Sequence, residues 1–162
     1  MVLAHGLEGS PEGRRASALR AAGLQLEAPD GRGLPLAPRV AGIIEAIAAH
    51  PGAVLVGSSY GGLAALAVVD RLGIEAQISG LVLLAPALSW SEPPVEDPEA
   101  LIVPRGVPAT VLHGVHDRIV PIEVSRRLSA RCPHIQLIER DDDHRLARSL
   151  DVMVATVKNY LR

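Results

Sequence analysis

The sequence contains no phenylalanine, one tryptophan and two tyrosines. This scarcity argues against nucleic-acid-binding modules, which stack bases on aromatic side chains. It also requires a core made mainly of leucine, isoleucine, valine and alanine. The single cysteine, Cys132, excludes an internal disulfide and indicates a reducing compartment.

The chain also lacks a strong net charge and a long apolar run. A formal charge of −2 gives no general attraction to nucleic acid or to an anionic membrane. The residues after Met1 form neither a signal peptide nor a membrane span, so we expect a cytoplasmic protein. With 162 residues, 48% of them hydrophobic and 21% charged, we expect a single globular domain spanning 1–162.

Short aliphatic runs alternate with longer amphipathic segments along the chain. The aliphatic runs predict strands at 2–4, 24–28, 53–57, 80–84, 109–112 and 134–139. The amphipathic segments predict helices near 13–22, 38–49, 60–71, 121–131 and 146–161. This alternation predicts an α/β fold: a three-layer sandwich with a mainly parallel six-stranded sheet flanked by helices. Segment 89–106, rich in proline and acidic residues, interrupts the alternation, and we expect it to be a loop or short cap.

The stretch VGSSYGG combines a G-x-S-x-G pattern with a preceding strand and a following helix. The pattern is formed by Gly57, Ser59 and Gly61. In that context it is typical of a nucleophile elbow, a tight turn that exposes a serine hydroxyl. A simple strand-to-helix turn built from small residues is the alternative interpretation.

A serine nucleophile needs a base and an acid, and candidates for both follow predicted strands. Asp117 lies in the loop after 109–112, and His144 lies in the loop after 134–139. Open α/β sheets place their sites at these carboxyl ends. The chain order Ser59, Asp117, His144 is the order of a serine hydrolase triad on such a sheet, so the sequence predicts that triad.

Two backbone N–H groups are expected to form an oxyanion hole. One belongs to Tyr60, directly after the nucleophile, and the other to Leu7, in the loop after the first strand. The turn around Leu7 can also be interpreted simply as a helix start, with Ser10-Pro11 as its cap. Trp90 and Leu88 are candidates for the walls of an acyl pocket. The alternative interpretation of Trp90 is a residue that covers the edge of the core.

Other residues compete for the same roles. His116 is an alternative base because it adjoins Asp117. The run Asp141–Asp143 is interpreted as solvated surface charge, with replacement of Asp117 by one member as the alternative. His113, His116 and Asp117 could suggest a metal site, but no further ligands stand at zinc spacing, and we expect no metal. His5 and Cys132 are interpreted as structural.

Taken together, AHGLEGS, VGSSYGG, HGVHDRIVP and DDDH resemble the α/β-hydrolase superfamily, in particular its small bacterial esterase-like and thioesterase-like members. The resemblance covers nearly the whole chain, without the antiparallel hairpin that usually precedes the first strand. It implies a minimal α/β-hydrolase fold that cleaves a small-molecule ester or thioester through an acyl-serine intermediate, without a cofactor. A lactonase or peptidase with the same triad, and a non-catalytic binding protein on the same scaffold, remain alternatives.

Overall fold

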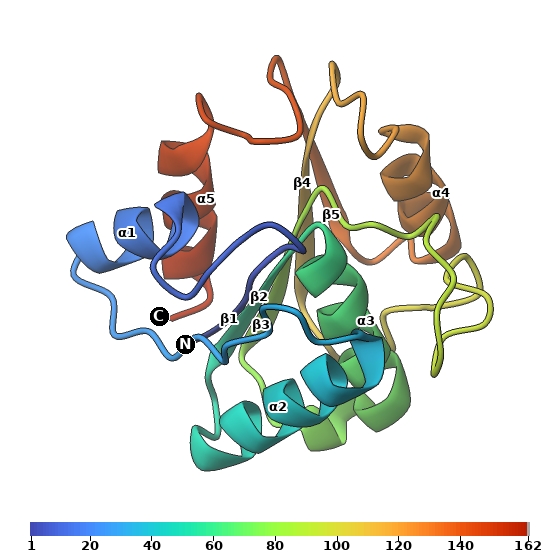
Figure 1. Cartoon of the computed structure of the whole chain (residues 1–162). Helices are drawn as coiled ribbons and strands as arrows, with labels where there is room; N and C mark the ends of the chain where they lie inside the picture. Colours follow the sequence, from blue (N-terminus) through green and yellow to red (C-terminus); the bar gives the residue numbers. More distant parts are fainter. Residues whose placement is uncertain (162) are drawn as a thin grey trace.

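The computed structural model describes residues 1–161 as five strands, five α-helices and one short 3₁₀ helix (Figure 1). The strands are β1 (Val2–Ala4), β2 (Val54–Ser58), β3 (Gly80–Leu84), β4 (Ala109–Gly114) and β5 (Gln136–Arg140). The helices are α1 (Arg14–Ala21), α2 (Leu36–Ala49), α3 (Tyr60–Leu72), α4 (Glu123–Arg131) and α5 (Leu150–Asn159), and the 3₁₀ helix η1 covers Gly73–Ala76. Among residues 1–161, no helix combines the length and apolar character needed to cross a membrane.

All five strands are parallel and lie side by side in chain order, β1-β2-β3-β4-β5. Alternate side chains of β2 enter different cores: Val54 and Val56 pack on one face of the sheet, and Leu55 packs on the other. Both faces are therefore covered, which explains why the central strands are continuous aliphatic runs.

The helices divide between the two faces of the sheet. The larger core contains residues of α2, α3 and α4, and the smaller core contains residues of α1 and α5. Figure 1 shows α1 beside α5 on one side of the sheet and the other three helices on the opposite side. The predicted α/β sandwich of three layers is confirmed.

The prediction of six strands is wrong, because segment 24–28 does not extend into a full strand. It forms one isolated parallel bridge, between Val2 and Glu27. Two backbone hydrogen bonds flank this bridge, from Glu27 N to Met1 O and from Leu3 N to Glu27 O, and the pairing with β1 ends there. The next bond of a parallel ladder would need an N–H at position 29, and Pro29 has none. Proline thus ends the sixth strand after a single bridge.

The connection between β3 and β4 contains the segment that we expected to be a loop or cap. It is irregular, with one isolated bridge between Glu92 and Val95. Val95, Leu101 and Val103 are nevertheless buried in the larger core. The connection is therefore anchored to the domain by its own apolar side chains.

Candidate active site

Ser59 occupies a strained turn between β2 and α3. Its φ of 53° and ψ of −117° lie where non-glycine residues are rarely found. Ser59 N donates to Leu84 O at 2.9 Å, and its own carbonyl accepts a hydrogen bond from Ala87 N at 3.0 Å. These contacts to the end of β3 hold the turn in its unusual conformation, as a nucleophile elbow requires.

The two glycines of the motif are needed because other backbone passes close to them. A Cβ added at Gly57 would lie 2.7 Å from Ala65 Cβ and 2.7 Å from Gly61 O. A Cβ at Gly61 would collide with the carbonyl oxygens of Ala4 and His5. The spacing of the motif therefore reflects the packing of α3 against β2 and against the loop after β1.

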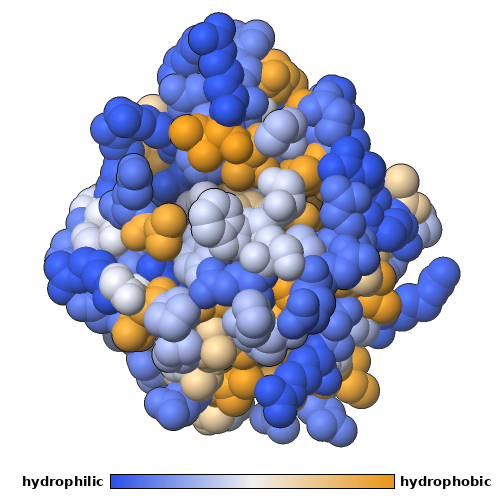
Figure 2. Space-filling view, turned by 45° about the vertical axis from the view of Figure 1, so that its right-hand side comes forward, coloured by the Kyte–Doolittle hydropathy of each residue, from blue (hydrophilic) through white to orange (hydrophobic). Residues whose placement is uncertain are grey.

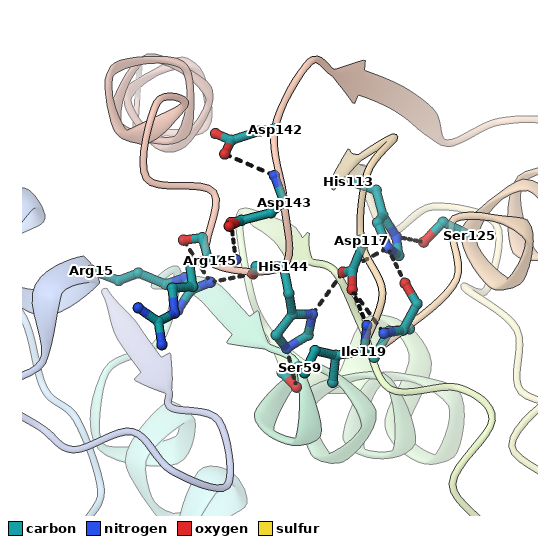
Figure 3. A network of polar contacts seen from close by, with 11 residues as sticks. Arg15, Ser59, His113, Asp117, Ile119, Ser125, Asp142, Asp143, His144 and Arg145 are labelled. Atoms are coloured by element: carbon teal, nitrogen blue, oxygen red, sulfur yellow. Dashed lines mark hydrogen bonds and ion pairs between the residues drawn. The ribbon is translucent and has the colours of Figure 1, made fainter.

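The structure brings Ser59, Asp117 and His144 together in one chain of hydrogen bonds (Figure 3). His144 Nε2 lies 3.0 Å from Ser59 Oγ, and His144 Nδ1 lies 2.7 Å from Asp117 Oδ2. An ionised carboxylate only accepts hydrogen bonds, so Nδ1 carries the proton and Nε2 is free to accept the serine proton. The arrangement is that of a nucleophile, a base and an orienting acid.

Asp117 is a fully buried carboxylate with many donors. Its Oδ1 accepts hydrogen bonds from the N–H groups of Ile119 and Val120, both at 2.8 Å. Burial alone would raise the pKa of Asp117, but these bonds and those from His113 and His144 outweigh it. The pKa of Asp117 is therefore held well below its ordinary range, and the side chain is a permanent anion at neutral pH.

His113 is a second, fully buried imidazole beside this carboxylate. Its Nε2 lies 2.9 Å from Val120 O and 3.2 Å from Asp117 Oδ2, and both of these atoms are acceptors. Its Nδ1 lies 2.7 Å from the hydroxyl of Ser125 on α4. The proton therefore resides on Nε2, and the hydroxyl of Ser125 donates to Nδ1. From the sequence, His113 was a candidate only for a metal site.

The loop that carries His144 is held from two sides. Asp142, 3% exposed, accepts hydrogen bonds from Asp143 N, Arg148 N and the Ser149 hydroxyl. The interpretation of Asp142 as a solvated charge is therefore wrong, because its carboxylate organises the turn between β5 and α5. From α1, Arg15 Nη2 donates to the His144 carbonyl at 3.2 Å.

The loop after β1 passes beside Ser59 and carries Leu7. A Cβ added at Gly6 would lie only 3.4 Å from Ser59 Cβ. Buried His5 accepts a hydrogen bond from Gly31 N at 3.0 Å, and its carbonyl accepts one from Arg39 Nη1 at 2.9 Å. His5 thus has the structural role expected from the sequence, whereas nothing in the sequence pattern pointed to Arg39.

The other expected oxyanion donor, Tyr60, is the first residue of α3, where the N–H has no partner within the helix. Its hydroxyl donates to Glu92 Oε2 at 2.5 Å, and Glu92 Oε1 accepts a hydrogen bond from Leu36 N at 3.1 Å. Burial and the neighbouring Glu92 raise the pKa of Tyr60 to about 12. Trp90 packs edge-on against the Tyr60 ring, with the centroids 6.4 Å apart. These contacts tie the elbow to the β3–β4 connection.

Several candidates from the sequence lie elsewhere. The exposed side chain of His116 pairs with Asp141 at 2.8 Å, so neither residue replaces the base or the acid beside Ser59. Leu88 is 1% exposed within the larger core and presents almost no surface to a substrate. Cys132 is buried, and its sulfur accepts a hydrogen bond from Val103 N at 3.3 Å.

No family model matches the chain, and no curated protein matches it by sequence. Its structure is nevertheless similar to solved structures over almost its full length. A protein of the alpha/beta hydrolase superfamily from Xanthomonas campestris pv. campestris superposes with a TM-score of 0.77 and 23% identity, covering 99% of this chain and 95% of that one.

Two further structures are similar at lower identity. Est1E from Butyrivibrio proteoclasticus has a TM-score of 0.74 and 20% identity, over 99% of this chain and 85% of that one. A monoacylglycerol lipase from Paleococcus ferrophilus has a TM-score of 0.73 and 19% identity, over 98% and 93%. The protein therefore has the α/β-hydrolase fold, in a version with five strands.

Proposed function

We propose that this protein is a serine hydrolase that cleaves a small carboxylic ester or thioester through an acyl-serine intermediate. The observation that carries the proposal is the continuous chain of hydrogen bonds from Ser59 through His144 to buried Asp117. A binding scaffold has no need for a strained serine, a tautomer-fixed histidine and a buried anion in one line. The similarity to a monoacylglycerol lipase is in keeping with an acyl substrate.

In the acylation step, His144 Nε2 removes the proton from Ser59 Oγ as that oxygen attacks the carbonyl carbon of the substrate. The carbonyl oxygen becomes an anion, which the N–H groups of Tyr60 and Leu7 stabilise. The protonated His144 is stabilised by Asp117. When the intermediate collapses, His144 gives its proton to the departing alkoxide or thiolate.

Deacylation repeats these roles with water as the nucleophile. His144 removes a proton from water, the resulting hydroxide attacks the acyl carbon, and the proton returns to Ser59 Oγ as the acid leaves. The imidazole of His144 is 20% exposed, so water can reach it without movement of a lid. The cycle uses no group beyond this chain and water.

The surface near the site favours a small apolar acyl group. Leu7 and Trp90 are each 53% exposed, and Ile119 is 72% exposed, two residues after Asp117. Figure 2 shows that apolar side chains on this view of the molecule form separate small patches in a hydrophilic surface. Such patches suit a short acyl chain resting on the rim of the site better than a large polymer held in a deep tunnel.

The test is hydrolysis of p-nitrophenyl esters and matched thioesters of increasing acyl length. We expect Ser59→Ala to lower kcat by about 10⁴-fold or more, and a fluorophosphonate to label Ser59 in the wild type, as located by mass spectrometry. Ser129→Ala, a serine of α4 away from the site, serves as the matched control and should retain activity. A folded wild type without turnover and without label would overturn the proposal.

A further inference from the structure

A small cavity lies on the side of the sheet covered by α1 and α5, between the first turn of α1 and the loop after β1. Its volume is about 60 Å³, and its walls include Gly6, Ser10, Gly13, Arg14, Arg15 and Ser58. A water molecule needs about 10–15 Å³ of such space. The cavity therefore has room for a group of roughly four to six oxygen-sized atoms.

The charged side chains that line this cavity are of one sign. Arg14 and Arg15 contribute to its walls, and no acidic residue does. Within residues 1–161, Arg15 forms no ion pair, and both its burial and the charge of Arg14 lower its pKa. A partly buried cation beside a like charge is unfavourable unless an anion compensates it.

Two buried polar atoms of the lining residues also lack partners. Ser58 is 1% exposed, and neither its Oγ nor the Nε of Arg15 has a hydrogen-bond partner within residues 1–161. Buried polar groups are nearly always satisfied, so atoms of this kind point to a bound species. They lie on different elements, Ser58 at the end of β2 and Arg15 on α1.

The first turn of α1 supplies further donors. The helix begins after Gly13, which has no side chain to cap it, and its first turn holds no acidic residue. The leading N–H groups of a helix lack intrahelical partners, and the helix dipole makes this end positive. Gly13–Ala16 all line the cavity, and because the Gly13 N–H already donates to Ser10 O, the positive end is presented by Arg14, Arg15 and Ala16.

From these observations we propose that the cavity is a binding site for a tetrahedral oxyanion, inorganic phosphate or sulfate. The donors come from two elements: α1 supplies its first turn and the guanidinium of Arg15, and β2 supplies the hydroxyl of Ser58. A phosphate or sulfate carries four oxygen atoms, so it can accept hydrogen bonds from donors on both elements at once. The positive charges and the helix end stabilise an anion in the cavity, whereas a neutral water molecule would leave these charges uncompensated.

The site would also brace the loop of the catalytic histidine. Arg15 Nη2 donates to the carbonyls of His144 and Arg145, both at 3.2 Å (Figure 3). An anion bound at Arg15 Nε restrains the same guanidinium and therefore that loop. The proposal does not depend on Ser59 chemistry, because binding of the anion can be measured without any substrate.

The test is a titration of the full chain with inorganic phosphate, followed by ¹H–¹⁵N correlation spectra at an ionic strength held constant with sodium chloride. We expect saturable shifts of the N–H resonances of residues 14–16, and equivalent shifts with sulfate. Arg15→Gln should weaken phosphate binding by about tenfold, and Ser58→Ala should weaken it several-fold. Arg71→Gln removes an equal charge at the far end of α3 and should bind as the wild type does.

The outcomes separate clearly. Arg14→Gln retains the contacts of Arg15 to the His144 loop, so it replaces Arg15→Gln if that variant fails to fold, and it should also weaken phosphate binding. Linear, non-saturating shifts in the wild type would overturn the proposal. Equal affinities in the Arg14, Arg15 and Ser58 variants and the wild type would do the same. A structure of crystals grown in phosphate would also overturn the proposal if the cavity held only water.

Discussion

The Nε2 atom of His113 lies 3.2 Å from Oδ2 of Asp117, the same carboxylate oxygen that accepts the Nδ1 proton of His144. Two imidazoles therefore face one oxygen atom. A carboxylate that already receives a donor attracts the next proton less strongly. In this site, His113 thus helps to keep the carboxylate of Asp117 ionised beside His144.

Replacement of His113 tests that relationship. In His113→Leu the donor is lost, so the pKa of Asp117 should be less depressed, and we expect acid-induced unfolding to begin at a higher pH than in the wild type. His113→Gln places an amide N–H near the former Nε2 and should keep the pH dependence of unfolding close to that of the wild type. A loss of stability in the leucine variant that is the same at every pH would show that His113 acts only through packing.

Asp117 should also make the free energy of unfolding depend on pH. Its pKa is depressed in the folded protein, so the folded state favours the ionised form. That contribution is complete above the ordinary pKa of an aspartate and is lost as the pH falls toward the depressed value. Urea denaturation should therefore show a larger stability difference between wild type and Asp117→Asn at about pH 6 than at about pH 3. A difference that stays constant over this range would contradict the assignment.

Two glycine-to-alanine substitutions should have opposite effects on stability. A methyl group at Gly61 collides with backbone oxygens of the loop after β1, so Gly61→Ala should destabilise the protein by about 3 kcal/mol or more and abolish ester turnover. At Gly42, inside α2, the nearest atom to an added Cβ is Pro29 Cβ at 3.8 Å. Gly42→Ala should therefore stabilise the protein by about 0.5–1 kcal/mol. Thermal unfolding of both variants measures the contrast.

The exposed ring of Trp90 should act on substrate binding rather than on the chemical step. Trp90→Ala removes apolar surface beside Tyr60, and we expect KM for longer acyl esters to rise about threefold to tenfold with little change in kcat. Trp90→Phe retains most of the apolar surface, so its KM should lie between those of the wild type and Trp90→Ala. Loss of kcat at unchanged KM would instead mean that Trp90 supports the elbow through its contact with Tyr60.

Local signals were sufficient to predict much of the fold and the three residues now found in hydrogen-bond contact. Strand and helix periodicity predicted the five helices, the five strands and a sixth strand that does not form, and the glycine motif identified Ser59 as the turn serine. Asp117 and His144 were predicted because each follows a strand, and the carboxyl ends of parallel strands meet at one edge of the sheet. These predictions needed only short-range pattern and topology.

The supporting contacts could not be predicted because they depend on distant residues in the chain. Arg15 and His144 are 129 positions apart, and Tyr60 and Glu92 are 32 apart. Neither Arg15 nor Glu92 belongs to a local motif. Asp142 was misinterpreted because three consecutive aspartates suggest a hydrated surface, whereas here the middle carboxylate turns inward to three donors. The predicted sixth strand does not form because Pro29 lacks the N–H group that the next hydrogen bond of the ladder would need.

The way in which the sheet ends bears on how the protein behaves when it is concentrated. An open row of backbone donors and acceptors invites another chain to add a strand. At one edge, the short segment around Glu27 covers β1, and Pro29 denies an incoming strand one of its donors. At the other, β5 bears Glu139 and Arg140 and exposes much of its length. The charged residues at the β5 edge and Pro29 at the β1 edge both oppose the addition of a strand from another molecule. Each edge of the sheet is therefore protected from aggregation by a different feature.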